Sequence, residues 1–236
     1  MNALQLFALA LAPGCAIILY IYRKDKHERE PLSLLAISFI YGILSTAVTF
    51  ILSWPLNTYI LLQRESLVDE FYSAFFKVAL VEEFSKFLFV RFVLFRNRNF
   101  NEPFDGIVYT VMVGMGFASL ENVLYVFQYG FETAIWRMFT AVPAHATFAI
   151  LMGFFLGKAK FAQGGKLLYM LTALFAATFF HGSYDYFWFI AQVKGTWAGI
   201  WLGAIASLIV GILLSRSAIR LHQHASPFVR SKTPAP

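Results

Sequence analysis

The chain alternates between long apolar stretches and short polar connections. Seven stretches reach the roughly 20 apolar residues that a helix needs to cross a bilayer: 3–22, 32–56, 71–95, 104–127, 134–157, 167–191 and 196–215. No connection between them is long enough for a soluble domain. The pattern predicts an all-α fold, a polytopic membrane helix bundle of about seven transmembrane helices. We expect one membrane domain over residues 1–215 and a polar, frayed tail over 216–236.

Basic residues are concentrated in alternate connections of this predicted bundle. Fourteen Lys and Arg lie after the first, fifth and seventh stretches and at the end of the third or just beyond it, whereas the other connections hold only Arg64, Arg137 and Lys194. Cytoplasmic connections of membrane proteins carry an excess of Lys and Arg. This distribution predicts that the N-terminus lies outside and the C-terminal tail lies in the cytoplasm.

Composition excludes an ordinary soluble domain. Of 236 residues, 59% are hydrophobic and only 14% are charged, against about half and about a quarter in soluble proteins. The net charge of +6 follows from the connections, so we expect no nucleic-acid partner and a lipid bilayer as the surroundings. A single cysteine, Cys15, excludes an internal disulfide framework and a cysteine-rich metal cluster.

Ionisable residues nevertheless occur inside the predicted spans: Lys77, Glu82, Glu83, Lys86, Asp105, Glu121, His145, His181 and Asp185. Each acid or lysine near the middle of a membrane costs about 2.5–3.5 kcal/mol on insertion scales, so such residues usually face the bundle interior and mark function. Lys86 is spaced to pair with Glu82 or Glu83 on one helix, but one lysine cannot neutralise both. One of the two carboxylates is therefore a candidate general base or acid. Asp105 is expected to cap the start of its helix.

Several of these residues share one level of the bilayer. With a rise of about 1.5 Å per helical residue, Glu82, Glu83, His145 and His181 lie about 15–18 Å below the outer surface, and Glu121 about 9 Å below it. Alternating helices thus bring them into the outer half of the membrane, which predicts a single site.

This residue set suits the activation of water for hydrolysis, in either of two ways. In the first, Glu82 or Glu83 deprotonates water while His145 and His181 polarise a carbonyl. In the second, His145, His181 and Glu121 bind Zn²⁺ and another glutamate is the base. Asp185, one turn after His181, can orient that ring. Asn122 can donate to an oxyanion or make a polar contact between helices. The sequence is compatible with both the zinc-dependent and the metal-free mechanism.

Five motifs in order resemble the PrsW family of intramembrane proteases. They are Val81–Lys86 (VEEFSK), Phe104–Tyr109 (FDGIVY), Gly116–Asn122 (GFASLEN), His145 and His181–Asp185 (HGSYD), and Asp25 with Glu30-Pro31 fits the N-terminal signature. The family is classed with metallopeptidases and is distantly similar to CAAX-processing endopeptidases, whose site is interpreted as metal-free.

The resemblance implies a multi-pass protein of the bacterial cytoplasmic (inner) membrane. It implies cleavage of a single-pass membrane protein, such as an anti-sigma factor, near the outer face, with Glu82, Glu83 and His181 as catalytic residues and His145 and Glu121 as partners. Two other hypotheses stay open. Buried Glu, Lys and His also build proton- or cation-coupled transporters, although the inverted repeats typical of those are not found, and the bundle could be a non-catalytic membrane scaffold.

Overall fold

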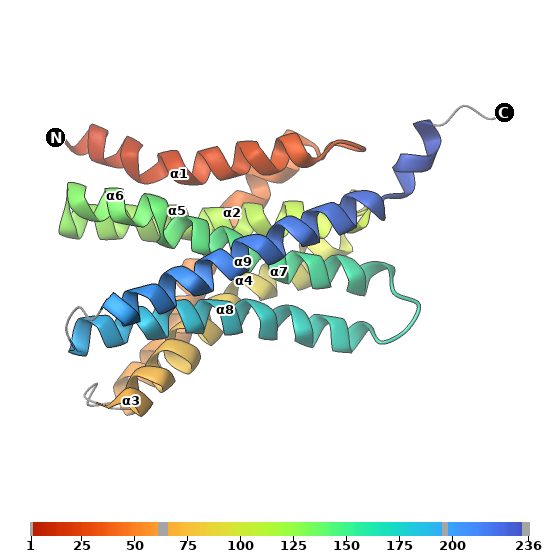
Figure 1. Ribbon diagram of the computed structural model, residues 1–236. Helices are drawn as coiled ribbons and strands as arrows, with labels where there is room; N and C mark the ends of the chain where they lie inside the picture. The colour runs from red at the N-terminus through yellow and green to blue at the C-terminus, as the bar shows by residue number, and fades with distance from the viewer. Residues whose placement is uncertain (1, 61–65, 195–197, 233–236) are drawn as a thin grey trace.

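The computed structural model describes residues 2–60, 66–194 and 198–232, and every regular element in these ranges is a helix (Figure 1). The predicted all-α fold is therefore confirmed. The elements are α1 (Ala3–Lys24), α2 (Leu32–Tyr59), α3 (Leu67–Tyr72), the π-helix η1 (Ser73–Ala79), α4 (Leu80–Phe92), the 3₁₀ turn η2 (Leu94–Arg96), α5 (Pro103–Tyr129), α6 (Phe131–Phe139), α7 (Ala141–Phe161), α8 (Lys166–Lys194), α9 (Ala198–His224) and the 3₁₀-helix η3 (Pro227–Lys232).

Six helical segments are long and apolar enough to cross a membrane: 3–24, 32–59, 103–129, 131–161, 166–192 and 201–224. They match six of the seven predicted spans. The remaining predicted span, 71–95, is not among them. The chain is helical there from Leu67 to Phe92, but this segment is too rich in charged residues to count as a candidate membrane span. Its seven charged residues are Asp69, Glu70, Lys77, Glu82, Glu83, Lys86 and Arg91. The orientation of the bundle stays a prediction, and Arg64, one of its markers, lies outside the described residues.

Helices α5 and α7 form the centre of the bundle. In their apolar segments 78% and 72% of the residues are buried, whereas in α1, α2, α8 and α9 only 17–28% are. The outer helices therefore present apolar side chains outward, among them Trp54, Leu168 and Phe175. A lipid environment accommodates such a surface, whereas water does not. The inner pair is shielded from lipid and is the place where polar groups can be held.

Glycines allow the central helices to approach closely. A Cβ on Gly116 of α5 would lie 2.0 Å from the carbonyl oxygen of Phe39 on α2, and one on Gly153 of α7 would lie 2.4 Å from that of Gly106 on α5. Small residues at such contacts let helix backbones pack in membranes. Tight packing around α5 fixes where the polar residues of α5 and α7 lie.

The segment before the paired glutamates is a π-helix rather than an α-helix. Residues 73–79 make up η1, and α4 begins directly after it at Leu80. A π-turn inserts one extra residue into a helix and is frequent at functional sites, because it rotates the residues that follow it. Glu82 and Glu83 lie in the first turn of α4, so η1 sets the face on which they point.

The end of α9 lies near the loop between α1 and α2. Helix α9 continues past Ser215 to His224, with Ala218, Ile219 and His222 buried, so the expectation of a frayed chain directly after Ser215 is wrong over this stretch. The side-chain amide of Gln223 donates to the Lys24 carbonyl. Both segments lie at the same end of the bundle in Figure 1. The division into a membrane domain and a tail stays a prediction.

Five acidic residues also gather at this end, and we call them the acidic cluster: Asp25, Glu28, Glu30, Glu102 and Asp105. Four are essentially buried, at 0–2% exposure, and Glu28 is half-buried. Removal from water raises the pKa of Asp25 and of Glu30 to about 7 each. Asp105 accepts from the backbone N–H groups of Asn101 and Glu102, at 2.7 Å each, which confirms its predicted capping role at the start of α5.

Candidate active site

Helix α4 supplies two carboxylates and the cation between them. Glu82 and Glu83 are adjacent, and Lys86 lies one turn later on the same side. The Lys86 ammonium donates to Glu83 Oε1 at 2.7 Å and lies 3.5 Å from Glu82 Oε2. It also lies 4.0 Å from the centre of the Phe117 ring, a cation–π contact from α5. Lys86 thus pairs most closely with Glu83, and Glu82 is the less neutralised of the two.

Helix α8 brings His181 between these carboxylates and Asp185. Its Nδ1 lies 2.9 Å from Glu83 Oε1, and its Nε2 lies 3.2 Å from Asp185 Oδ2 and 4.0 Å from Glu82 Oε2. The ring stacks on Phe148, with 4.8 Å between the centroids and 16° between the planes. A carboxylate at each nitrogen and an aromatic face fix the position of this imidazole, and Asp185 makes the contact that its spacing predicts.

His145 enters the same site from α7. Its Nδ1 lies 3.4 Å from the Lys86 ammonium, and its Nε2 lies 2.9 Å from Glu121 Oε2. The two imidazole rings are 5.1 Å apart and nearly perpendicular. Because the Nε2 side is occupied by Glu121, the Nδ1 side of His145 is the one that faces the other site residues.

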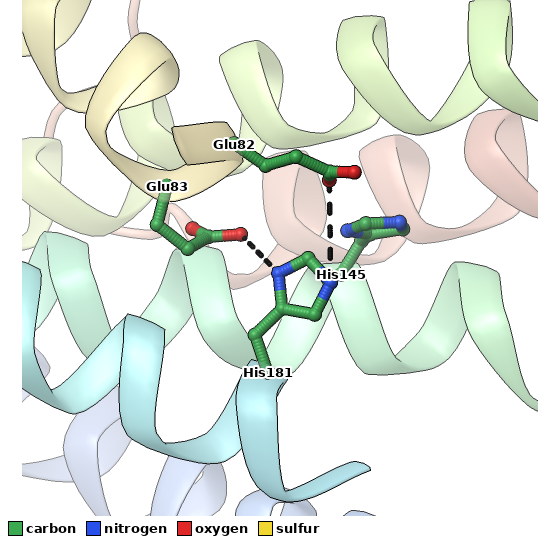
Figure 2. A group of neighbouring side chains, drawn as sticks. All are labelled: Glu82, Glu83, His145 and His181. Carbon is green, nitrogen blue, oxygen red and sulfur yellow. Dashed lines mark hydrogen bonds and ion pairs between the residues drawn. The ribbon is translucent and has the colours of Figure 1, made fainter. Parts of the chain in front are cut away.

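Three helices therefore place four metal-ligating side chains in one group, as Figure 2 shows. One ligand atom each from Glu82, Glu83, His145 and His181 lies within 4.8 Å of those of the other three. The residues come from positions up to 99 apart in the sequence. Their convergence is what the shared depth of the four residues predicted.

Glu121 and Asn122 form a second layer rather than part of this group. Glu121 Oε2 accepts from Arg137 Nη2 at 2.8 Å. Asn122 is fully buried, accepts from Arg137 Nε at 2.8 Å and donates to the Ala10 carbonyl at 2.7 Å. Both ends of its amide are engaged, which favours the polar helix contact over the oxyanion role. Glu121 reaches the group only through His145, so the converging donor set differs from the predicted zinc set of Glu121, His145 and His181.

Arg137 is the site residue that the sequence did not reveal. It lies on the short helix α6, and the sequence identified it only as one basic residue in an outer connection. It binds Glu121 and Asn122 and lies 4.1 Å from the centre of the Tyr125 ring. No spacing rule links α6 to α5 across the turn at Gly130, so its role is visible only in three dimensions.

The group lines a cavity of about 980 Å³. Glu82, His145, His181 and Asp185 reach its wall, together with aromatic residues that include Tyr125, Trp136, Tyr184, Trp188 and Trp201. Glu83, at 1% exposure, lies behind them. Glu82 Oε2 has no hydrogen-bond partner among the described residues. The Glu82 side chain thus reaches the cavity wall beside two histidines, with one carboxylate oxygen that accepts no hydrogen bond from the described residues and lies 3.5 Å from the Lys86 ammonium.

The donor types fit a metal ion. Two imidazoles with carboxylates are ligands of catalytic zinc, and Glu82 Oε2, which accepts no hydrogen bond among the described residues, is an oxygen that a cation would bind. Lys86 lies among the same atoms but is engaged by Glu83 and Phe117. The four residues Glu82, Glu83, His145 and His181 could hold such an ion.

Comparison with known proteins agrees with this geometry. Residues 30–215 match the model of a family described as the PrsW family intramembrane metalloprotease. The matched region contains all four converging residues, as well as Lys86, Glu121, Arg137 and Asp185. The match favours the protease hypothesis over the transporter and the scaffold.

Curated relatives share most of their length with this chain. The protease PrsW of Geobacillus kaustophilus is 38% identical over 202 residues, covering 85% of this chain and 87% of the relative. The protease PrsW of Bacillus subtilis is 33% identical over 195 residues (81% and 85%), and that of Clostridioides difficile is 33% identical over 206 residues (84% of each). No solved structure matches this chain.

Proposed function

Since this chain belongs to the PrsW family of intramembrane metalloproteases, we propose that it hydrolyses a peptide bond of a single-pass membrane protein in this cavity, with Glu82 as the general base. The observation that carries the proposal is that Glu82 lines the cavity beside His145 and His181, with one carboxylate oxygen that accepts no hydrogen bond from the described residues. Glu83, which is bound by Lys86 and His181, holds those two groups in place.

In the reaction, Glu82 takes a proton from water, and the resulting hydroxide attacks the scissile carbonyl carbon. The same carboxyl then gives that proton to the departing amide nitrogen, so the acid and base roles alternate on one side chain. His181 holds a carboxylate at each ring nitrogen, Glu83 at Nδ1 and Asp185 at Nε2, so it donates a hydrogen bond to the oxygen that becomes negative only when its Nε2–H turns from Asp185 to that oxygen. His145, which is oriented by Glu121, lies beside it.

A zinc ion held by the Glu/His group would supply a polarised carbonyl and water that ionises near neutral pH. The roles of Glu82 and Lys86 are the same with zinc or without it. Lys86 holds Glu83 in place through its ion pair, and burial of Glu83 keeps this pair away from water. Exclusion of water strengthens every electrostatic contact in the site.

The lining of the cavity favours an extended substrate that offers both apolar side chains and free backbone polar groups. Its wall combines several aromatic rings with many polar and charged side chains, which suits a segment of a membrane helix that has unwound near its end. We infer a substrate such as an anti-sigma factor, cut near the outer face of the bacterial cytoplasmic membrane. The alternating basic connections support this orientation.

Glu82→Gln tests the assignment of the base. Glutamine keeps the shape of the side chain but cannot take a proton, so cleavage of a tagged single-pass membrane protein in liposomes should fall by about 10²–10⁴-fold. Glu132→Gln, which alters an exposed carboxylate on α6, is the matched control and should retain full activity. Activity of Glu82→Gln equal to that of the parent would overturn the proposal.

A further inference from the structure

The acidic cluster lies far from the candidate active site. Asp105 and Glu121 are both on α5 and are 16 residues apart, which corresponds to about 24 Å along the helix. The cluster joins the loop between α1 and α2 to the start of α5, and the end of α9 contacts the beginning of that loop through Gln223. The hydrolytic mechanism above uses none of its residues.

The cluster has an excess of buried negative charge. Five carboxylates come together, and none of them forms an ion pair within 4.0 Å with any residue in the described ranges. Nearby cations are engaged elsewhere: the Lys160 ammonium donates to the Phe95 carbonyl, and the Arg29 guanidinium lies 5.3 Å from the centre of the Tyr22 ring. Buried carboxylates are rare without a paired charge or a metal ion.

Each of the five carboxylates also keeps one buried oxygen without a hydrogen-bond partner in the described structure: Asp25 Oδ1, Glu28 Oε2, Glu30 Oε1, Glu102 Oε2 and Asp105 Oδ1. The other oxygens of three of them are satisfied. Asp25 accepts from the Glu30 N–H at 3.2 Å, Glu30 accepts from the Tyr109 hydroxyl, and Asp105 accepts from two backbone N–H groups. Hydrogen bonds thus orient the carboxylates and leave a second set of oxygens free.

Three of the five carboxylates have the spacing of a cation site. One oxygen each from Glu28, Glu30 and Asp105 lies within 4.8 Å of those of the other two. Oxygen ligands lie about 2.3–2.6 Å from Ca²⁺ and about 2.0–2.1 Å from Mg²⁺, so two ligands of one ion are separated by at most about twice these lengths. No imidazole or thiol belongs to this group, and an all-oxygen set favours hard divalent cations.

We propose that Glu28, Glu30 and Asp105 bind a divalent cation of the calcium and magnesium class, and that this ion fastens the α1–α2 loop to the start of α5. Asp25 and Glu102 contribute charge around it. The ion is structural, since the reacting groups lie at the other end of α5.

The role of a clamp follows from what the cluster connects. The Lys24 carbonyl accepts from Gln223 of α9, so the same loop is also held by the end of the last helix. An ion bound only by the folded chain stabilises it by mass action. It would therefore stabilise the contact between the first, central and last helices against unfolding.

The test measures stability, which does not depend on proteolysis. The full-length protein carries His145→Ala and His181→Ala, so that ions bound by the Glu/His group do not contribute, and is stripped with a chelator in detergent. Adding CaCl₂ or MgCl₂ should raise its unfolding temperature by about 5–10 °C at 100 times Kd, whereas NaCl at equal ionic strength should not. Metal analysis should find one ion per chain.

The same rise should disappear in Glu30→Gln and in Asp105→Asn but persist in Glu132→Gln. Glu28→Gln, on the half-buried loop residue, provides a variant whose folding is least disturbed and should weaken binding at least tenfold. A rise that survives in all three cluster variants would overturn the proposal. So would an unfolding temperature that responds to acid but not to either cation, because that result means that the carboxyls share protons instead.

Discussion

The two buried polar clusters of this protein resemble each other in burial and differ in charge. At the candidate active site, four carboxylates (Glu82, Glu83, Glu121 and Asp185) alternate with two cations, Lys86 and Arg137, and with two histidines. At the acidic cluster, five carboxylates meet without a paired cation in the described chain. The first cluster can stay charged because cations and histidines lie among its carboxylates and offset their charge. The second needs a partner from outside the chain, either protons or a cation.

This difference in charge suggests different roles for the two clusters, catalysis at the candidate active site and structural ion binding at the acidic cluster. In a balanced cluster one group can change its protonation while its neighbours compensate, and Glu82 is the group left free to do so. An unbalanced set of oriented oxygens suits an ion that stays bound. The four predictions below test whether the two clusters differ in this way, beginning with the largest expected effect.

A buried histidine in each region gives the sharpest contrast. His181→Ala should lower cleavage by about 10²–10⁴-fold, because it removes the ring that lies between Glu83 and Asp185. His222→Ala, near the acidic end, removes a ring that stacks on Phe154 and should lower the unfolding temperature while cleavage continues. Initial rates and thermal unfolding of the two purified variants provide the comparison. Equal losses of activity would show that the regions are not functionally separate.

Removal of metal ions should affect the two clusters differently, because one offers imidazole and carboxylate ligands and the other only carboxylates. Treatment with 1,10-phenanthroline, which prefers transition metals, should lower cleavage at least about hundredfold, and Zn²⁺ should restore it. Ca²⁺ should not restore cleavage, although it should raise the unfolding temperature through the acidic cluster. Cleavage that survives complete removal of zinc, verified by elemental analysis, would instead support the metal-free glutamate site.

Lys86→Met would convert the balanced cluster into an unbalanced one. It leaves Glu83 buried at 1% exposure without its ammonium partner. Breaking a buried pair in this way costs about 3–5 kcal/mol, measurable as a loss in the free energy of unfolding in denaturant. Lys166→Met makes the same change at an exposed position and should cost less than about 0.5 kcal/mol. Comparable losses would mean that Lys86 does not balance the site.

Much of this contrast could be predicted from the sequence. Apolar length located six spans, and the rise per residue placed Glu82, Glu83, His145 and His181 at one level. Motif resemblance then pointed to the family. These inferences succeed because each depends on local helix geometry, which needs no knowledge of which helices are neighbours.

What depends on neighbours could not be predicted. The π-helix η1 interrupts the third segment at residues 73–79, and no feature of the sequence marks this position, because packing decides the rotation of α4. The sequence identifies Arg137 only as a basic residue of an outer connection, whereas the structure places it on α6 in contact with Glu121. Asp105 was predicted only as a helix cap, since the proximity of Glu28 and Glu30 comes from a contact between distant segments.

Arg137→Gln should produce the smallest effect, because Arg137 acts on the site through Glu121 and His145. Without the guanidinium, Glu121 keeps His145 Nε2 as a partner but loses the contact that orients it. Removing a group that orients a ligand or catalytic histidine lowers metal affinity or activity about 10–100-fold. We expect a decrease near the lower end, in kcat rather than in KM.

Arg137→Lys is the matched variant, because it keeps the charge but can replace only one of the two donor contacts to Glu121 and Asn122. It should therefore recover part of the lost kcat. A complete loss of cleavage in Arg137→Gln would mean that Arg137 contacts the substrate directly. An unchanged kcat would mean that the contact between Arg137 and Glu121 does not help to position His145.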